Sequence, residues 1–179
     1  MVVPGNSRFT TAKDLVAYAK ANPGKLDVAS SGSGTSVHLS AELFQQLAGL
    51  EMTHIPYKGT GSALPDLLSG AVALMFPNLP SAVPLIQNGR LRALGVTTAM
   101  RSAAAPQIPT LAEAGIAGYD MSTWYGLIGP ANLPADITNK RNTELRAVLR
   151  AAQIREKLVS HGVDPVIGSP AAFGAFMQD

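Results

Sequence analysis

Short apolar runs alternate with stretches of helical periodicity from Val2 to Thr97. The apolar runs predict strands at Val2–Val3, Leu26–Ala29, Met52–Ile55, Val72–Phe76 and Arg92–Thr97. The stretches between them predict one helix after Thr11 and further helices at Val37–Ala48, Ala63–Ser69 and Ser81–Asn88. Strands and helices that alternate across short loops are typical of an α/β fold with a doubly wound sheet of mostly parallel strands.

Capping residues mark the ends of these predicted helices. A hydroxyl at Thr11 with a carboxylate at Asp14 fits a capping box. Gly49, Gly70 and Gly89 each follow a predicted helix, where glycine commonly ends one. Within the helix at Val37–Ala48, apolar residues four positions apart fall on one stripe, namely Leu39, Leu43 and Leu47. We therefore expect a compact α/β domain with its own core.

Small and hydroxyl-bearing residues fill the turn between the strand at Leu26–Ala29 and the next helix. The first amides of a helix lack intrahelical partners, so this turn suits a carboxylate or phosphate. It equally fits a plain, well-capped connection between a strand and a helix. Turns at Tyr57–Ser62 and Pro77–Asn78 follow the next two predicted strands. Because ligands bind at the carboxyl ends of parallel strands, we expect the three turns to form one concave rim.

The pattern changes after the strand at Arg92–Thr97. A loop is expected up to Pro109, and Thr110 to Glu113 forms another capping box before a short helix that ends at Gly115. The stretch Tyr119–Ile128 predicts a strand that leaves one sheet and enters another. Helices are expected at Ala135–Ala152, at Gln153–Ser160 and after Ser169.

Composition narrows the class of protein. Of the 179 residues, 46% are hydrophobic and 15% are charged, which is typical of a packed globular chain. A net charge of +2, scattered along the chain, argues against a nucleic-acid partner. The absence of cysteine excludes disulfides and thiolate metal sites. No run has the length of a membrane span, and Met1–Gly5 does not resemble a signal peptide.

Most catalytic and cofactor motifs are missing. There is no nucleophile elbow and no P-loop, and Val37 stands where a dinucleotide fingerprint needs its third glycine. The three histidines are far apart in sequence, without metal-ligand spacing and without an acid expected to orient any of them. We therefore expect no cofactor and no metal. Trp124 is either core between domains or a wall of a ligand cleft.

Several of these motifs together resemble one family. They occur in the family's order across almost the whole chain, at Ala29–Leu39, His54–Gly59, Met75–Ser81, Leu91–Thr97 and Trp124–Leu127. In this respect the chain is similar to the Bug-type, TctC-like solute-binding receptors of tripartite tricarboxylate transporters.

The resemblance implies a periplasmic receptor of the type II binding-protein fold. Such a receptor closes on a small carboxylate and passes it to membrane permease subunits. Backbone amides and hydroxyls at strand-to-helix turns bind the carboxylate. The positions that match these turns are Ser31, Gly32, Ser33, Gly34, Thr35, Ser36, His38, Tyr57, Gly59, Thr60, Gly61, Ser62 and Asn78.

The family's chains are longer than this one. The resemblance therefore implies a complete ligand-binding α/β domain at residues 1–123, and a crossover strand with helices of an incomplete first domain at 124–179. The apolar residues of the helices after Pro130 then need a surface to pack on, so we expect residues 130–179 either to self-associate or to be mobile. An α/β enzyme that uses His38 with a nearby serine is the alternative; it would require a hydrogen-bonded Ser–His pair with an orienting partner.

Overall fold

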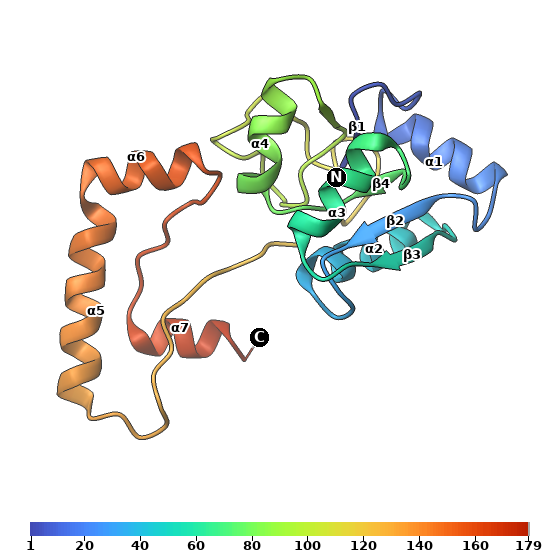
Figure 1. The fold of residues 1–179 in the computed structure, drawn as a ribbon. Coiled ribbons are helices and arrows are strands. Elements are labelled where there is room, and N and C mark those ends of the chain that lie inside the picture. Colours follow the sequence, from blue (N-terminus) through green and yellow to red (C-terminus); the bar gives the residue numbers. More distant parts are fainter. Residues whose placement is uncertain (179) are drawn as a thin grey trace. The chain divides into compact units, whose positions relative to one another are not determined.

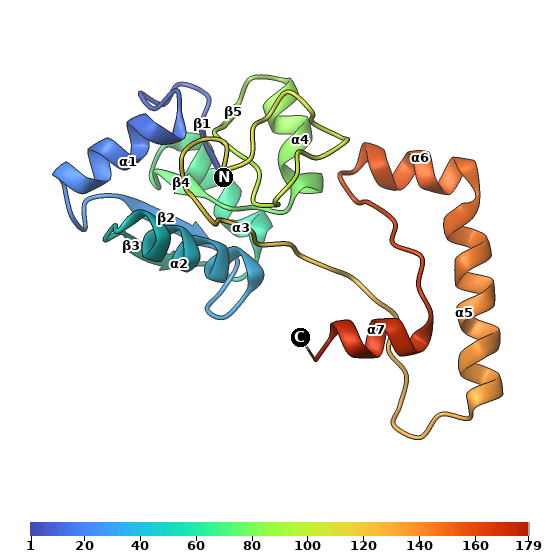
Figure 2. The same cartoon turned by 180° about the vertical axis from the view of Figure 1, so that it is seen from behind.

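A computed structural model describes residues 1–178, which divide into two compact units (Figures 1 and 2). The first unit, Met1–Thr123, contains all five strands and the helices α1 to α4. The second unit begins at Trp124 and contains α5 to α7. That the first unit is the ligand-binding domain and the second a part of another domain stays a prediction.

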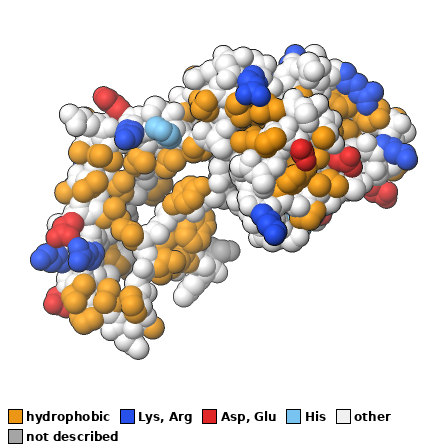
Figure 3. All heavy atoms as spheres, viewed as in Figure 1, with side chains coloured by type: hydrophobic (Ala, Val, Ile, Leu, Met, Phe, Trp, Pro, Cys, Tyr) orange, Lys and Arg blue, Asp and Glu red, His pale blue; other side chains and the backbone are white. Residues whose placement is uncertain are grey.

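The second unit consists of helices and connecting loops. Its helices are α5 (Ala135–Arg150), α6 (Ala152–Ser160) and α7 (Pro170–Phe176), close to the predicted ranges. Trp124 packs edge to face on Phe173 and Phe176, with ring centroids 5.5 and 5.8 Å apart. None of the described residues of the second unit is buried. Hydrophobic side chains cover much of the surface of this unit in Figure 3.

The crossover strand predicted at Tyr119–Ile128 is wrong. The described chain has no strand in this stretch or in the rest of the second unit. A strand requires a paired neighbour along its length. In this stretch Tyr119 is buried in the first unit and its amide donates to the Ile116 carbonyl, and, among the described residues, only the Met121 amide bonds to the backbone of a distant segment, at the Thr97 carbonyl.

The first unit is built on a sheet with the strand order β3-β2-β4-β1-β5. Its strands are β1 (Val2–Pro4), β2 (Asp27–Ser30), β3 (Thr53–Pro56), β4 (Leu74–Met75) and β5 (Leu91–Ala93). β2 pairs in parallel with β3 and with β4, which confirms the predicted α/β class. β1 pairs antiparallel with β4 and β5, so the sheet is mixed at this side.

The antiparallel strand β1 lies between β4 and β5, although β4 and β5 follow one another in the chain order of the strands. The Met1 carbonyl accepts a hydrogen bond from the Leu94 amide at 3.0 Å, and the Met1 amino group donates to the Gly95 carbonyl at 2.6 Å. Burial lowers the pKa of that amino group to about 5. Direction of pairing depends on these distant contacts, which is why the local pattern at Val2–Val3 predicted a strand without its orientation.

The helices of the first unit begin and end close to the predicted positions. They are α1 (Ala12–Ala21), α2 (Ser36–Ala48), α3 (Thr60–Ser69) and α4 (Leu79–Gln87). The capping box of Thr11 and Asp14 is present, and Gly49 ends α2 in the left-handed conformation.

The buried face of α2 differs from the predicted leucine stripe. Val37, Ala41 and Phe44 are buried, while Leu39 and Leu47 are 47% and 41% exposed. Both sets have helical spacing. The face with the smaller residues at its first two turns packs on the sheet, because valine and alanine allow a closer approach.

Helices α2 and α3 lie on opposite faces of the sheet (Figures 1 and 2). This follows from strand order, because the chain passes from β2 to β3 and then returns across β2 to β4 with right-handed crossovers. The direction of winding thus reverses at β2. Ligands of such folds bind outside the carboxyl end of the strands at this point of reversal.

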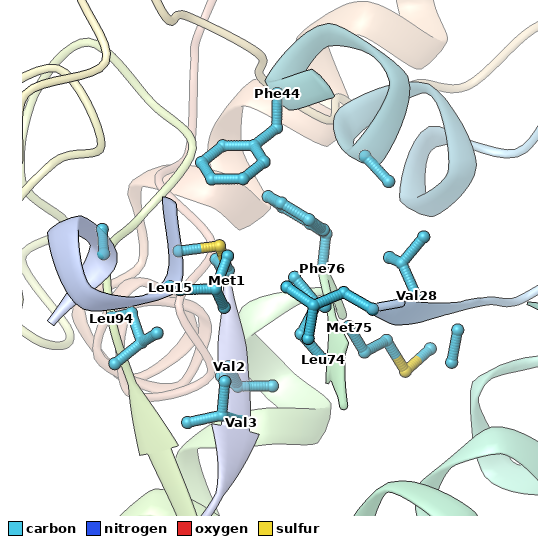
Figure 4. Packing of buried hydrophobic residues seen from close by; sticks show 14 of the residues in the cluster. Met1, Val2, Val3, Leu15, Val28, Phe44, Leu74, Met75, Phe76 and Leu94 are labelled. Atoms are coloured by element: carbon cyan, nitrogen blue, oxygen red, sulfur yellow. The ribbon is translucent and has the colours of Figure 1, made fainter. Parts of the chain in front are cut away.

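Aromatic side chains join the sheet to α2 and to the end of the first unit. Figure 4 shows Phe44 of α2 against Phe76, above Leu74 and Val28; the two rings lie 5.6 Å apart. Tyr119 packs on Phe44 and donates a buried hydrogen bond of 2.7 Å to the Ser40 carbonyl. Burial raises the pKa of Tyr119. Tyr119, near the end of the first unit, therefore holds α2 in place, and α2 is the helix that begins after the Ser31–Thr35 turn.

The region around Thr110 differs from prediction in two ways. β5 ends at Ala93, and Val96 forms only an isolated parallel bridge with Thr110. The capping-box hydrogen bonds of Thr110 and Glu113 are present, but the segment forms turns rather than a helix. Gly115, with φ of 104°, ends the helical turn as soon as it has begun.

We expect Gly5→Ala to destabilise the first unit by about 1–3 kcal/mol. A Cβ atom on Gly5 would overlap the backbone oxygen of Gly89, and backbone cannot move aside as a side-chain end can. Chemical denaturation measures the change. The control is Gly61→Ala, where a Cβ atom meets nothing within 4 Å and alanine favours the helix. Equal stability of the two variants would contradict the prediction.

Candidate functional site

The three predicted turns lie at one edge of the sheet. β2 pairs with β3 through Ser30 opposite Pro56, and with β4 through Ala29 opposite Met75, so the carboxyl ends of these strands are neighbours. The Tyr57 amide donates to the Ser30 carbonyl at 3.1 Å. A Cβ atom on Gly32 would lie 3.5 Å from the Tyr57 carbonyl oxygen. The expected arrangement of the exits is therefore confirmed, whereas the ligand-binding role of their residues stays a prediction.

Hydroxyl groups hold the first turn together from inside. Thr35 caps α2: its Oγ1 accepts from the His38 amide at 3.4 Å and donates to the Gly32 carbonyl at 2.7 Å. Ser31 Oγ donates to Thr35 Oγ1 at 3.1 Å. Gly32 and Gly34 have φ of 130° and 78°, a region that favours glycine. The hydroxyls of Ser31 and Thr35 therefore shape the turn rather than point freely outward.

Backbone amides supply the free donors of this turn. Within residues 1–178, the amides of Ser33, Ser36 and Val37 have no hydrogen-bond acceptor. The dipole of α2, a helix of 13 residues, adds partial positive charge at the same place. Donors and dipole together make this turn suited to an anion.

The second turn uses its side chains internally as well. Tyr57 donates to Asp66 Oδ2 at 2.6 Å, and this hydrogen bond raises the pKa of Tyr57. Ser62 Oγ donates to the carbonyl of Gly59, the residue that caps α3 with φ of 113°. Thr60 and Gly61 form the first positions of α3, so their amides are oriented like those at the start of α2.

The third exit leads into α4. Asn78 is the N-cap residue of this helix, without a capping hydrogen bond from its side chain. Its carbonyl accepts from the Ser81 amide at 3.1 Å and from Ser81 Oγ at 2.8 Å. Asn78 therefore follows β4, the strand that pairs in parallel with β2, and its role in ligand binding stays a prediction.

Sequence reasoning missed a hydrogen-bonded pair beneath the first turn. The buried Ser30 Oγ lies 2.6 Å from His54 Nε2 and accepts from the Gly32 amide at 3.1 Å. Burial, and then the neighbouring His38, lower the pKa of His54. The pair follows from parallel pairing of β2 with β3, so only a prediction of strand register could have revealed it.

His38 lies beside both another histidine and an acid. Its ring stacks on that of His54 at 4.0 Å, and its Nε2 lies 3.5 Å from Glu42 Oε1. Its Nδ1 accepts from the Gly34 amide at 3.1 Å. The expectation that no histidine has an acidic neighbour is therefore wrong, because Glu42 stands one helical turn after His38 on the same face of α2.

This cluster does not have the arrangement of a catalytic Ser–His pair. Ser30 is fully buried, so its hydroxyl cannot reach a substrate. The acid lies beside His38, whereas the serine contacts His54. Residues 1–178 contain no group of three or more His, Cys, Asp or Glu side chains placed to hold a metal ion. None of the helices described is both long and apolar enough to span a membrane.

The model of one protein family matches residues 1–179, the family described as tripartite tricarboxylate transporter family receptor. A protein from the tcbD-tcbE intergenic region of Pseudomonas sp. is 38% identical to this chain over 171 residues. That alignment covers 95% of this chain and 51% of the relative. BugT of Bordetella pertussis is 35% identical, over 92% of this chain and 51% of its own length.

Solved structures of similar proteins include two with small carboxylates named. One is described as Rpa4515 of R. palustris with adipate; it has a TM-score of 0.93 and 37% identity, over 99% of this chain and 59% of its own. The other is MatC of Rhodopseudomonas palustris with bound malate, at a TM-score of 0.88 and 26% identity, over 99% and 61%. The chain thus spans about half the length of these curated relatives and about 60% of these structures.

We expect Ser30→Ala to lower the free energy of unfolding by about 1–3 kcal/mol, because His54 Nε2 and the Gly32 amide would lose a partner that reaches them from a buried residue. Chemical denaturation measures this. Ser33→Ala is the matched control, since Ser33 is exposed and its hydroxyl makes no hydrogen bond in the described chain. A loss of the same size in both variants would show that the hydrogen bonds of Ser30 add nothing to stability.

Proposed function

This chain belongs to the tripartite tricarboxylate transporter family of receptors, and we propose that the protein captures a small carboxylate for such a transporter. The observation that carries this proposal is the turn at the start of α2, where unpaired amides and the helix dipole meet at the reversal point of the sheet. Similar structures described with adipate and malate support a dicarboxylate.

Members of this family are periplasmic solute-binding proteins and not enzymes. The family membership thus stands against the alternative of an α/β hydrolase or transferase. By the same reasoning we assign this protein to the periplasm, and the membrane subunits of the transporter are its partners in this proposal.

The proposed contacts are chiefly backbone amides. The free amides of Ser33, Ser36 and Val37 face the first turn, and those at the start of α3 belong to the neighbouring turn. The side chains of Thr35 and Tyr57 orient these donors, because each is hydrogen-bonded within the domain. A carboxylate held by amides needs no charged partner from the protein.

We expect Thr35→Val to weaken binding of adipate or malate by roughly 3- to 10-fold, the loss typical of one hydrogen bond. Valine keeps the shape but removes the oxygen that contacts Ser31, Gly32 and His38, so the turn loses its geometry. Isothermal titration calorimetry on the whole protein measures the affinity.

Thr53→Val is the control for this experiment. Thr53 lies at the opposite end of β3, where its hydroxyl donates to the Gly24 carbonyl. The affinity of the Thr53→Val variant for adipate and for malate should equal that of the unchanged protein. If neither adipate nor malate binds the unchanged protein, the proposed carboxylate function is wrong.

We further propose that residues 130–179 associate with a second copy of the chain when they have no other apolar surface to cover. In α5 and α7, Ile137, Val148 and Phe176 are 42%, 51% and 53% exposed. Exposed apolar side chains that gather into a patch drive association in water.

Light scattering on the chain of residues 1–179 should therefore give a mass above that of a monomer. Ile137→Lys with Val148→Lys should lower the mass, because these residues lie on one face of α5. The control is Asn139→Lys with Thr143→Lys, which adds the same charge at exposed polar positions elsewhere on the helix. A monomer at all concentrations would disprove self-association.

A further inference from the structure

One amide of the anion-binding turn is already engaged by a side chain. The Gly34 amide donates to His38 Nδ1 at 3.1 Å, across one turn from the start of α2. Because this nitrogen accepts a hydrogen bond, it carries no proton in this arrangement. The imidazole thus occupies a donor that lies among the free amides of the same turn.

The position of the His38 ring is determined by the cluster beneath the turn. It stacks on His54 at 4.0 Å with an interplanar angle of 22°, and His54 in turn is bonded to the buried Ser30. Its second nitrogen, Nε2, lies 3.5 Å from Glu42 Oε1. These contacts hold Nδ1 facing the Gly34 amide.

We propose that His38 is a proton-sensitive gate of the carboxylate site: its Nδ1 competes with the ligand for the Gly34 amide, and protonation of the ring releases that amide. This inference rests on the proposed function, since it assumes a carboxylate at the first turn. It assigns to His38 a role opposite to direct ligand contact at neutral pH.

The chemistry of the ring gives the direction of the effect. A proton on Nδ1 removes the lone pair that accepts from Gly34, and it adds a positive charge beside the site. The charged and titratable groups that face the ring are Glu42 from α2 and His54 from β3. Glu42 stabilises the protonated ring, while burial, and then His38, lower the pKa of His54. Carboxylate binding therefore strengthens at a pH low enough for the ring to take up a proton.

Two variants separate the parts of this mechanism. His38→Ala removes the acceptor and leaves the Gly34 amide free at every pH. His38→Asn keeps an acceptor near the position of Nδ1 but takes up no proton in this range. The cap of α2 remains in both variants, because it uses the backbone amide of residue 38.

Calorimetric titration of the whole protein with adipate and with malate, at about pH 8 and about pH 6, tests the inference, since ordinary carboxylates stay ionised throughout this range. At the higher pH, His38→Ala should bind roughly 3- to 10-fold tighter than the unchanged protein, the gain from one released hydrogen bond. At the lower pH the unchanged protein should gain about 5-fold, whereas both variants should keep their affinities.

Three results overturn the inference. Weaker binding by His38→Ala at both pH values makes His38 a direct ligand contact. If the unchanged protein, His38→Ala and His38→Asn all show the same pH dependence, His38 does not control the site, while the proposed function stands. Absence of binding to any of the three overturns the proposed function, and this inference with it.

Discussion

The parallel pairing of β2 with β3 and β4 is the constraint on which the rest of the first unit depends. It places three strand exits at one edge, and it reverses the winding of the chain at β2. It also brings Ser30 against His54, although the two lie 24 positions apart in sequence. The free amides at the start of α2 therefore lie close to a part-buried polar pair that the same strand pairing creates.

Polar groups at this edge divide into two kinds. The hydroxyls of Ser31, Thr35 and Tyr57 are hydrogen-bonded within the domain, so they determine geometry. The backbone amides of the first turn remain as donors. Fixing side chains before a ligand arrives lowers the entropy that binding would otherwise lose, which favours recognition by backbone over recognition by flexible charged chains.

Local features of the sequence predicted most of this fold. The Thr11 capping box and the glycines after α2, α3 and α4 marked helix ends, because capping depends on residues close in sequence. Features that depend on distant partners escaped prediction. These include the antiparallel direction of β1, the unpaired stretch after Tyr119 and the contact of Ser30 with His54. The neighbouring positions of the three strand exits followed from strand order, whereas the histidine cluster required the register.

The first unit has a buried apolar core, whereas the described residues of the second unit have none, and this difference determines which contacts position the donors of the first turn. In the first unit, apolar residues from β1 through Tyr119 form one core, and the last ring of that core holds α2 through Ser40. The residues described after Thr123 contain no buried side chain. The donors at the first turn are therefore positioned by contacts within the first unit alone. The geometry of these donors is determined by β2, by α2 and by the rings of Phe44 and Tyr119 that pack against each other.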